Sequence, residues 1–218
     1  MTIKIYGGTL SPFVRKTVVF AIEKGIDFEL VAAFGAMAPP EFRKASPFGK
    51  IPAMVDGDFS LADSTAIVTY LDAIKPEPNL IPTEAKARAK TIWYEEFGDT
   101  LVAACGGKVF FNRFVAPRFM GREGDLKAAD EAQANEFPKL VDYLERVLPA
   151  SGYLVEDRFT LADIAVCSPF ATMAHVDCTV NPTTHPKAYG YIQAITARPS
   201  FAKLLEQERA MVKPKEPA

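Results

Sequence analysis

The sequence predicts an α/β region followed by an all-helical region, and three features of the residue pattern support this fold class. In the first 74 residues, short alternating segments typical of strands are interleaved with segments of helical spacing. Residues 75–83 (KPEPNLIPT) then carry three prolines, which interrupt both periodicities. Beyond them the strand signals vanish and the helical stretches lengthen. We therefore predict a first domain at 1–76, a linker at 77–84 and a helical second domain at 85–218.

The first unit is predicted to be β-α-β. Residues 3–6 alternate apolar and polar side chains, as a short strand does. From Pro12 the apolar residues recur at helical spacing, and Gly25 stands where the C-terminal cap of a helix belongs. Residues 26–30 alternate again, which predicts a second strand.

A β-β-α unit follows a looser stretch that is rich in Ala, Pro and Phe. Two short strand-like runs, 53–55 and 59–61, flank an Asp-Gly-Asp sequence, and Asp-Gly in that position is a strong hairpin signal. Asp63 and Ser64 then precede a helical pattern, and either of them could be its N-cap.

The C-terminal region is predicted to be helical almost throughout. Its apolar residues recur at helical spacing in five stretches: 84–104, 106–119, 125–148, 161–175 and 185–208. The β-α-β and β-β-α units followed by helices alone are the basis of the predicted fold class.

Composition and charge exclude several classes of protein. The 218 residues are 49% hydrophobic and carry a formal net charge of −2, whereas nucleic-acid binding needs a concentrated basic face. No apolar run approaches the ~20 residues that span a bilayer, and the N-terminus lacks the pattern of a signal peptide. Three cysteines without CxxC spacing and only two histidines argue against a disulfide scaffold or a zinc site. We expect a cytoplasmic protein that binds no metal, nucleic acid or membrane.

Two prolines mark positions where chemistry could be placed. Pro12 suits a first helical turn, so Ser11 lies at or near the N-cap, and taken alone it is most simply a capping serine. Pro52 stands at the start of a predicted strand, which is unusual unless its peptide bond is cis or the strand edge is special. Only about 5–6% of X–Pro bonds are cis, so this pattern alone leaves both explanations open.

Four sequence segments, taken in order, resemble the glutathione S-transferases over nearly the whole chain. Ser11 and Arg15 match the serine and arginine that follow the first strand in theta-, delta- and phi-like classes. Residues 46–52 (SPFGKIP) resemble the family's K-V/I-P segment, and residues 61–71 (LADSTAIVTYL) its "L-x-E-S-x-A-I-x-x-Y-L" run. Residues 159–165 (FTLADIA) resemble the buried capping motif of the second domain. The pattern indicates a bacterial, serine-type member.

The resemblance implies a thioredoxin-like N-terminal domain and the all-helical C-terminal domain of this family. It also implies a homodimeric detoxification enzyme that conjugates the thiolate of its co-substrate glutathione to small hydrophobic electrophiles. Two other functions are compatible with the scaffold. One is a glutathione-binding or interaction protein with little turnover, and the other is a glutathione-dependent peroxidase or isomerase.

The turn after the first strand carries a serine where thiol-dependent relatives have a cysteine. Disulfide exchange is therefore excluded there, because no protein sulfur is available. Lowering a thiol pKa from ~8.5 to roughly 6.5 takes about 2.7 kcal/mol. A hydroxyl donor to an anion supplies about 1.5–3 kcal/mol, and a helix N-terminus adds about 0.3–1 kcal/mol. Ser11 is thus the candidate catalytic donor, although Tyr6 is an alternative because some classes use a tyrosine near this strand.

The other matched positions imply a site for glutathione. The backbone of Ile51, presented by a cis Pro52, would pair with the cysteinyl part. Ser64 would take the γ-glutamyl carboxylate at a helix N-terminus, and Asp63, where the family more often has Glu or Gln, would face the ammonium. Lys50 is the candidate for the glycyl carboxylate, with a solvated surface lysine as the alternative.

The pocket for the second substrate is less well marked. Leu10 and Phe13 flank the serine, and Phe110 and Phe114 belong to an aromatic cluster in the second domain. We predict that they line an apolar cleft between the domains, although aromatic residues at helical spacing more often belong to a core.

One further motif is predicted to be structural. Thr160 and Asp163 have the spacing of a capping box. In this motif the side chain of the N-cap residue bonds to the backbone of the third helical residue, whose side chain bonds back to the N-cap backbone. We expect this pair to stabilise the fold without touching glutathione.

Overall fold

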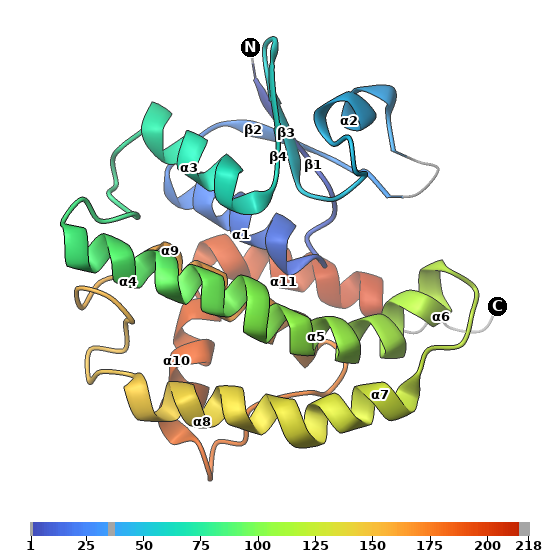
Figure 1. Ribbon diagram of the computed structural model, residues 1–218, viewed down its shortest axis with the longest axis vertical. Coiled ribbons are helices and arrows are strands. Elements are labelled where there is room, and N and C mark those ends of the chain that lie inside the picture. Colours follow the sequence, from blue (N-terminus) through green and yellow to red (C-terminus); the bar gives the residue numbers. More distant parts are fainter. Residues whose placement is uncertain (1, 35–37, 214–218) are drawn as a thin grey trace.

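The structure is a computed structural model that describes residues 2–34 and 38–213. Within those residues, the N-terminal part forms a four-stranded sheet in the order β2-β1-β3-β4 (Figure 1). Strand β1 pairs in parallel with β2 and antiparallel with β3, which pairs antiparallel with β4. The bounds are Ile3–Tyr6 for β1, Phe28–Val31 for β2, Ala53–Asp56 for β3 and Phe59–Ala62 for β4. The predicted β-α-β and β-β-α units are therefore both present.

Three helices accompany the sheet. Helices α1 (Pro12–Glu23) and α3 (Ser64–Ile74) pack together, whereas α2 (Pro40–Ala45) lies on the other side of the strands (Figure 1). The sequence analysis did not predict α2, because a helix of six residues is too short to show a periodic pattern. It is held in place because Phe42 and Ala45 are buried against the sheet.

The second region begins with one long helical rod from Ala85 to Phe119. It contains α4 (Ala85–Glu96), α5 (Ala103–Phe110) and α6 (Ala116–Phe119), joined by π-helical turns. The predicted interruption near residue 105 is wrong. The π-helical turns change the spacing of apolar residues, and Gly106 serves close packing, since a Cβ there would lie 3.2 Å from the Met173 side chain.

The rest of the described second region is also helical. Its helices are α7 (Leu126–Glu131), α8 (Phe137–Val147), α9 (Leu161–Ala174), α10 (Pro186–Thr196) and α11 (Pro199–Val212). A π-helical turn joins α7 to α8 without a break, in agreement with the single helix predicted at 125–148. The single helix predicted at 185–208 is wrong, because this stretch forms two helices, α10 and α11. Arg198 is extended (φ −60°, ψ 143°), because the ring of the following proline disfavours helical backbone at the preceding residue.

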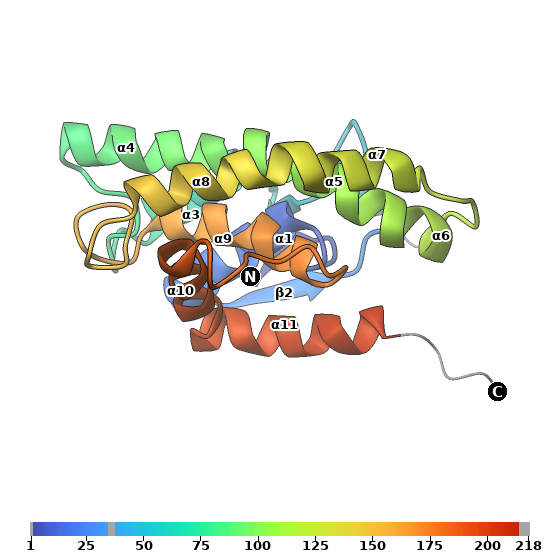
Figure 2. The ribbon, with the colours of Figure 1, turned by 90° about the horizontal axis from the view of Figure 1, so that it is seen from below.

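Helix α9 forms the centre of the molecule. Figure 2 shows it between the row of α4, α5, α7 and α8 on one side and α11 on the other. Every residue from Leu161 to Met173 is buried, which explains why this helix has no polar face. Within the described part of the chain, no helix combines the length and the apolar character needed to cross a bilayer.

A capping box of Thr160 and Asp163 starts α9. The buried Asp163 carboxylate accepts hydrogen bonds from the Thr160 N–H (2.9 Å), the Leu154 N–H (3.1 Å) and the Tyr191 hydroxyl (3.0 Å). One side chain therefore ties the start of the central helix to α10 and to the preceding loop.

Asp163→Ala is expected to lower the free energy of unfolding by about 3 kcal/mol, because three buried donors lose their acceptor together. Denaturant unfolding measures this loss. Glutathione affinity, measured at a temperature where the variant is folded, should be unchanged. Weaker binding at wild-type stability would contradict the structural role.

Candidate functional site

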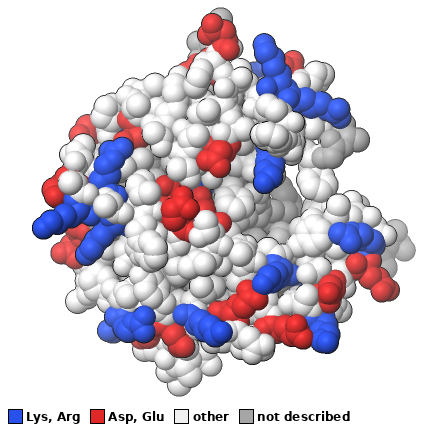
Figure 3. All heavy atoms as spheres, in the orientation of Figure 1, with Lys and Arg blue, Asp and Glu red and all other residues white. Residues whose placement is uncertain are grey.

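A groove with a volume of about 1460 Å³ opens where the sheet meets the long helical rod. Figure 3 shows this face of the molecule hollowed, with acidic side chains beside the hollow. The groove walls come from the start of α1, the loop before β3, the start of α3 and the π-helical turn at Phe97–Val102. The lining includes all six residues predicted to contact glutathione: Ser11, Lys50, Ile51, Pro52, Asp63 and Ser64.

Ser11 is the N-cap of α1, with an extended backbone (φ −72°, ψ 125°), and its side chain is half-buried. None of the described N–H groups of α1 donates to its hydroxyl. The Ser11 side chain therefore does not act as a hydrogen-bonding cap of α1. Ser11 lines the groove at the positive end of a helix dipole, which is a favourable place for an anion.

Gly7 allows the serine turn to approach the loop before β3. Its φ is +144°, and a Cβ there would lie 2.5 Å from the Val14 side chain and 3.2 Å from the Cβ of Ile51. Only glycine fits both the backbone angle and the space. This close approach brings the turn that carries Ser11 and the backbone of Ile51 onto the same groove wall.

The loop before β3 is closed by a serine. The buried Ser46 hydroxyl donates to the Lys50 carbonyl at 2.7 Å, and the Ile51–Pro52 peptide bond is cis. This hydrogen bond fixes the chain just before Ile51. The Lys50 side chain is exposed at the groove.

Asp63 and Ser64 have different roles at the start of α3. Asp63 is the N-cap, with φ at +83°, and its Oδ1 accepts from the N–H groups of Thr65 (2.9 Å) and Ala66 (3.1 Å). A positive φ in a residue other than glycine is strained, and such strain clusters at functional sites. Ser64 is buried, and its hydroxyl donates to Asp99 Oδ2 at 3.4 Å. The alternative that Ser64 is the cap is thus ruled out.

Asp99 is a groove residue that the sequence analysis missed. It lies on the π-helical turn after α4 and is paired with the buried Lys16 ammonium, which also bonds to Glu95 at 2.8 Å. Burial raises the pKa of Asp99, and the charge of Lys16 partly offsets this effect. The turn approaches α9 because Gly98 leaves no room for a Cβ, which would lie 2.6 Å from a backbone oxygen of α9. No motif in the sequence marks this contact.

The structure does not place all the residues of the predicted apolar pocket in the groove. Phe13 lines the groove, but the half-buried Leu10 does not, and Phe110 and Phe114 are buried and stacked on each other at 5.1 Å between ring centroids. Phe119 continues this row to Phe34, which does line the groove; the ring centroids of Phe34 and Phe119 are 5.2 Å apart.

Tyr6 is not among the residues that line the groove. It is 2% exposed and packs against Phe42 of α2, with 6.1 Å between ring centroids. Burial raises the pKa of its hydroxyl. The position of Tyr6 in the core between sheet and α2 favours Ser11 as the donor to a ligand.

The three cysteines are buried and unpaired. Burial raises the pKa of Cys105 to about 11 and that of Cys178 to about 12, and it also raises the pKa of Cys167 well above its ordinary value. Because the thiolate is the reactive form, these side chains are poor nucleophiles.

A buried ion pair fastens the serine turn to the helical region. The Arg15 guanidinium, one turn into α1, binds the Glu208 carboxylate of α11 at 3.1 and 2.5 Å. It also donates to the Thr172 hydroxyl of α9 at 2.8 Å, and this hydroxyl donates to the Leu10 carbonyl at 3.2 Å. The residue before Ser11 and the residue one turn after it are thus held by the second region.

Sequence models of two domains match the chain. The glutathione S-transferase N-terminal domain matches residues 5–79, and the glutathione S-transferase C-terminal domain matches residues 111–208. Glutathione S-transferase 3 of Zea mays is 33% identical over 207 residues, which cover 92% of this chain and 92% of the relative. The chain belongs to the glutathione S-transferase family.

Solved structures of glutathione S-transferases share the fold. Glutathione transferase F7 from Populus trichocarpa superposes with a TM-score of 0.82 at 26% identity, covering 94% of this chain and 98% of that protein. Glutathione S-transferase-I, solved with the ligand lactoylglutathione, superposes with a TM-score of 0.80 at 26% identity, covering 94% and 99%. The predicted fold class, a thioredoxin-like region followed by helices, is confirmed.

Proposed function

We propose that the protein is a glutathione transferase in which the Ser11 hydroxyl keeps the glutathione sulfur ionised. The observation that carries this proposal is the groove itself. Three features line the groove: the Ser11 hydroxyl, which accepts no hydrogen bond from the N–H groups of α1, the backbone of Ile51, and the N-terminus of α3. These are a donor for a thiolate, a strand-like edge for a peptide and an anion site for a carboxylate.

The reaction needs no general base from the protein. The bound thiol loses its proton to solvent, and the Ser11 hydroxyl donates to the resulting thiolate while the α1 dipole adds to the stabilisation. The sulfur then attacks an electrophilic carbon, a carbon–sulfur bond forms, and the leaving group departs with its electron pair. Ser11 forms no covalent bond.

The charges of glutathione match the groove from end to end. The γ-glutamyl carboxylate would bind the N-terminus of α3 at Ser64. Its ammonium would face Asp63, whose Oδ2 is available because both capping bonds use Oδ1, and Asp99 would add a second carboxylate. The exposed Lys50 ammonium would meet the glycyl carboxylate. The electrophile would lie against Phe13 and Phe34.

Replacing Ser64 with alanine is expected to raise the KM for glutathione about tenfold with little change in kcat, because the hydroxyl, which donates to Asp99 in the free protein, turns on binding to a charged group that does not react. Steady-state kinetics with glutathione as the varied substrate measures the effect. Ser60→Ala is the matched control, since Ser60 also lines the groove but is exposed on β4. Equal effects of the two substitutions would remove Ser64 from the carboxylate site.

We also propose that the protein is a homodimer, as the family resemblance implies. Phe48, in the loop at the groove, is 91% exposed, and aromatic residues, Phe among them, are enriched at protein–protein interfaces. A cytoplasmic location stays a prediction from composition.

Phe48→Ser is expected to shift the protein from dimer to monomer at micromolar concentration. Light scattering coupled to size-exclusion chromatography measures the mass. A wild-type monomer, or a variant that stays dimeric, would contradict this anchor.

Retention on immobilised glutathione, followed by conjugation of a generic aryl halide, tests the activity. Both are expected. Retention without conjugation would instead favour a binding protein with little turnover, and activity only toward peroxides or isomerisable substrates would favour the third alternative.

A further inference from the structure

A hydrogen bond from the helical region reaches the backbone of the serine turn at the carbonyl oxygen of Leu10. The Thr172 hydroxyl of α9 donates to this oxygen at 3.2 Å. Thr172 is 3% exposed and does not line the groove, so it acts on a bound ligand only through other residues. The Leu10 carbonyl and the Ser11 N–H belong to one planar peptide unit. The contact therefore bears directly on the backbone that carries the Ser11 hydroxyl.

The surroundings of Thr172 direct its single proton toward Leu10. The Arg15 guanidinium donates to the Thr172 hydroxyl oxygen at 2.8 Å, so this oxygen is an acceptor toward Arg15 and keeps its own proton for another partner. A second acceptor within reach is the Ser168 carbonyl of α9 at 3.3 Å, but that carbonyl already accepts from Arg15 at 2.5 Å. The Leu10 carbonyl is thus the acceptor that depends most on the hydroxyl.

The other backbone bonds of the serine turn are local. The Ser11 N–H donates to the Gly8 carbonyl at 3.0 Å, and the Ser11 carbonyl accepts from the Arg15 N–H at 2.9 Å. Both bonds join residues of the same strand–helix junction, so they hold its shape without fixing it against the second region. The bond from Thr172 ties the peptide plane between Leu10 and Ser11 to a different part of the molecule.

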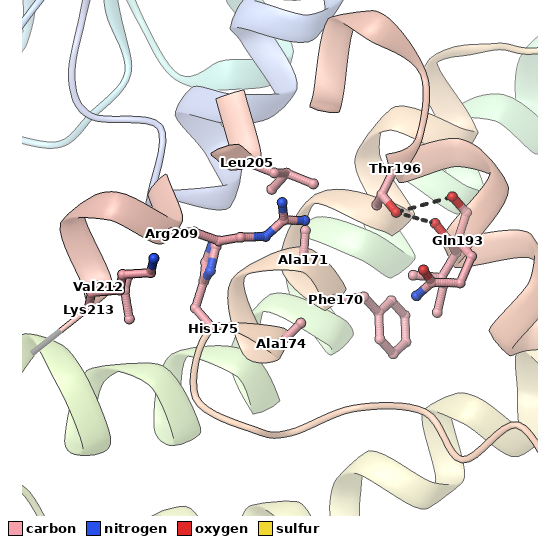
Figure 4. A pocket seen from close by; sticks show the side chains of 11 residues that line it. Phe170, Ala171, Ala174, His175, Gln193, Thr196, Leu205, Arg209, Val212 and Lys213 are labelled. Atoms are coloured by element: carbon pink, nitrogen blue, oxygen red, sulfur yellow. Dashed lines mark hydrogen bonds between the residues drawn. The ribbon is translucent and has the colours of Figure 1, made fainter. Parts of the chain in front are cut away.

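The last turn of α9, which carries Thr172, is itself held in place. Figure 4 shows Ala171, the residue before it, beside the Arg209 side chain of α11, and both residues line the cavity between these helices. One turn further on, the His175 ring contacts the Glu208 carboxylate of α11 at 2.8 Å. The hydroxyl that reaches the serine turn is therefore presented by a fixed support, as precise positioning requires.

We propose that Thr172 is a positioning residue for Ser11. Its hydroxyl fixes the Leu10–Ser11 peptide plane, and the fixed plane aims the Ser11 hydroxyl at the sulfur of bound glutathione. Without this bond the plane tilts, the hydroxyl spends less time in good donor geometry, and the thiolate loses part of its stabilisation. The inference rests on the proposed role of Ser11 in the transferase reaction.

Thr172→Val removes the hydroxyl and keeps a side chain of nearly the same shape. It is expected to raise the pKa of the bound glutathione thiol by about half a unit to one unit, and to lower kcat at pH 6.5 by about three- to tenfold. The KM for glutathione should change little. Thr172→Ser, which keeps the hydroxyl, should stay within about twofold of the wild type in kcat. Thiolate absorbance and steady-state kinetics measure the two effects.

Thr91→Val is the matched control. Thr91 is also a completely buried threonine of a helix, but its hydroxyl donates to the Ala87 carbonyl of the same helix, at 2.9 Å. This variant should titrate like the wild type. Circular dichroism confirms that each variant is folded.

A double-mutant cycle tests whether Thr172 acts through Ser11. In the Ser11→Ala background, Thr172→Val should cause no further rise in the thiol pKa. A wild-type thiol pKa in Thr172→Val, an equal shift in Thr91→Val, or an undiminished effect without the Ser11 hydroxyl would overturn the inference while leaving the role of Ser11 intact. A wild-type complex that titrates like free glutathione would instead reject the role of Ser11, and this inference with it.

Discussion

Ser11→Ala is expected to slow conjugation at pH 6.5 by about 10- to 100-fold, while the KM for glutathione changes little. The hydroxyl donates to a charged sulfur, and such a bond contributes about 1.5–3 kcal/mol. Since it stabilises the anion over the thiol, removing it raises the pKa of the bound thiol. The loss of rate should therefore shrink as pH rises above about 8.5, where the free thiol ionises unaided. Steady-state kinetics from pH 5.5 to 9 measures the profile.

Tyr6→Phe is the matched control for this prediction. It also deletes a single hydroxyl, but from a buried ring that packs against Phe42 and does not line the groove. Its pH profile should coincide with that of the wild type. If Tyr6→Phe lost the activity at low pH and Ser11→Ala kept it, the roles of the two hydroxyls would be reversed.

Arg15→Ala is expected to lower the free energy of unfolding by about 3–5 kcal/mol, because it leaves the Glu208 carboxylate buried without its strongest partner. For a chain of this size, that loss lowers Tm by about 10 °C. The substitution also releases the Thr172 hydroxyl and, through it, the Leu10 carbonyl beside Ser11. Calorimetry measures the stability, and the thiol pKa of the remaining folded protein reports on the serine turn.

The same ion pair predicts a dependence on pH. The pKa of Glu208 is lower in the folded protein than in the unfolded chain, where it is ordinary. Its contribution to stability is therefore complete above the unfolded pKa and is lost as pH falls through the folded pKa. Wild-type stability should fall across that acidic range more steeply than the stability of Arg15→Met/Glu208→Leu. This double variant should also recover part of the Arg15→Ala loss, because apolar pairs can replace buried ion pairs. A single variant as stable as the wild type would contradict the account.

Those parts of the fold and of the site that depend on neighbouring residues could be predicted from the sequence. Pro12 after Ser11, Gly25 after α1 and Asp-Gly between β3 and β4 act over a few residues, so their effects are readable from neighbouring positions. The groove contacts of Ile51 and Ser64 were predictable only because the motifs around them resemble those of a family. The place of Ile51 beside the turn that carries Ser11 depends on Gly7, whose close contact with Ile51 is visible only in the tertiary structure.

Features that depend on contacts between distant segments could not be predicted from the sequence. Asp99 reaches the groove because Gly98 packs closely on α9 and Lys16 pairs with its carboxylate, two contacts that no local pattern encodes. The burial of Phe110 and Phe114 follows in the same way from packing in the second region. Helix α2 was missed because six residues show too little of a helical period.

Titration of the thiolate absorbance of bound glutathione is the most direct test of the role assigned to Ser11. The binary complex of the wild-type protein should titrate with a pKa of roughly 6.5, about two units below the free thiol. The complex with Ser11→Ala should titrate at least one unit higher, and that with Tyr6→Phe should match the wild type. A thiol pKa that stays at its wild-type value without the Ser11 hydroxyl would contradict the mechanism.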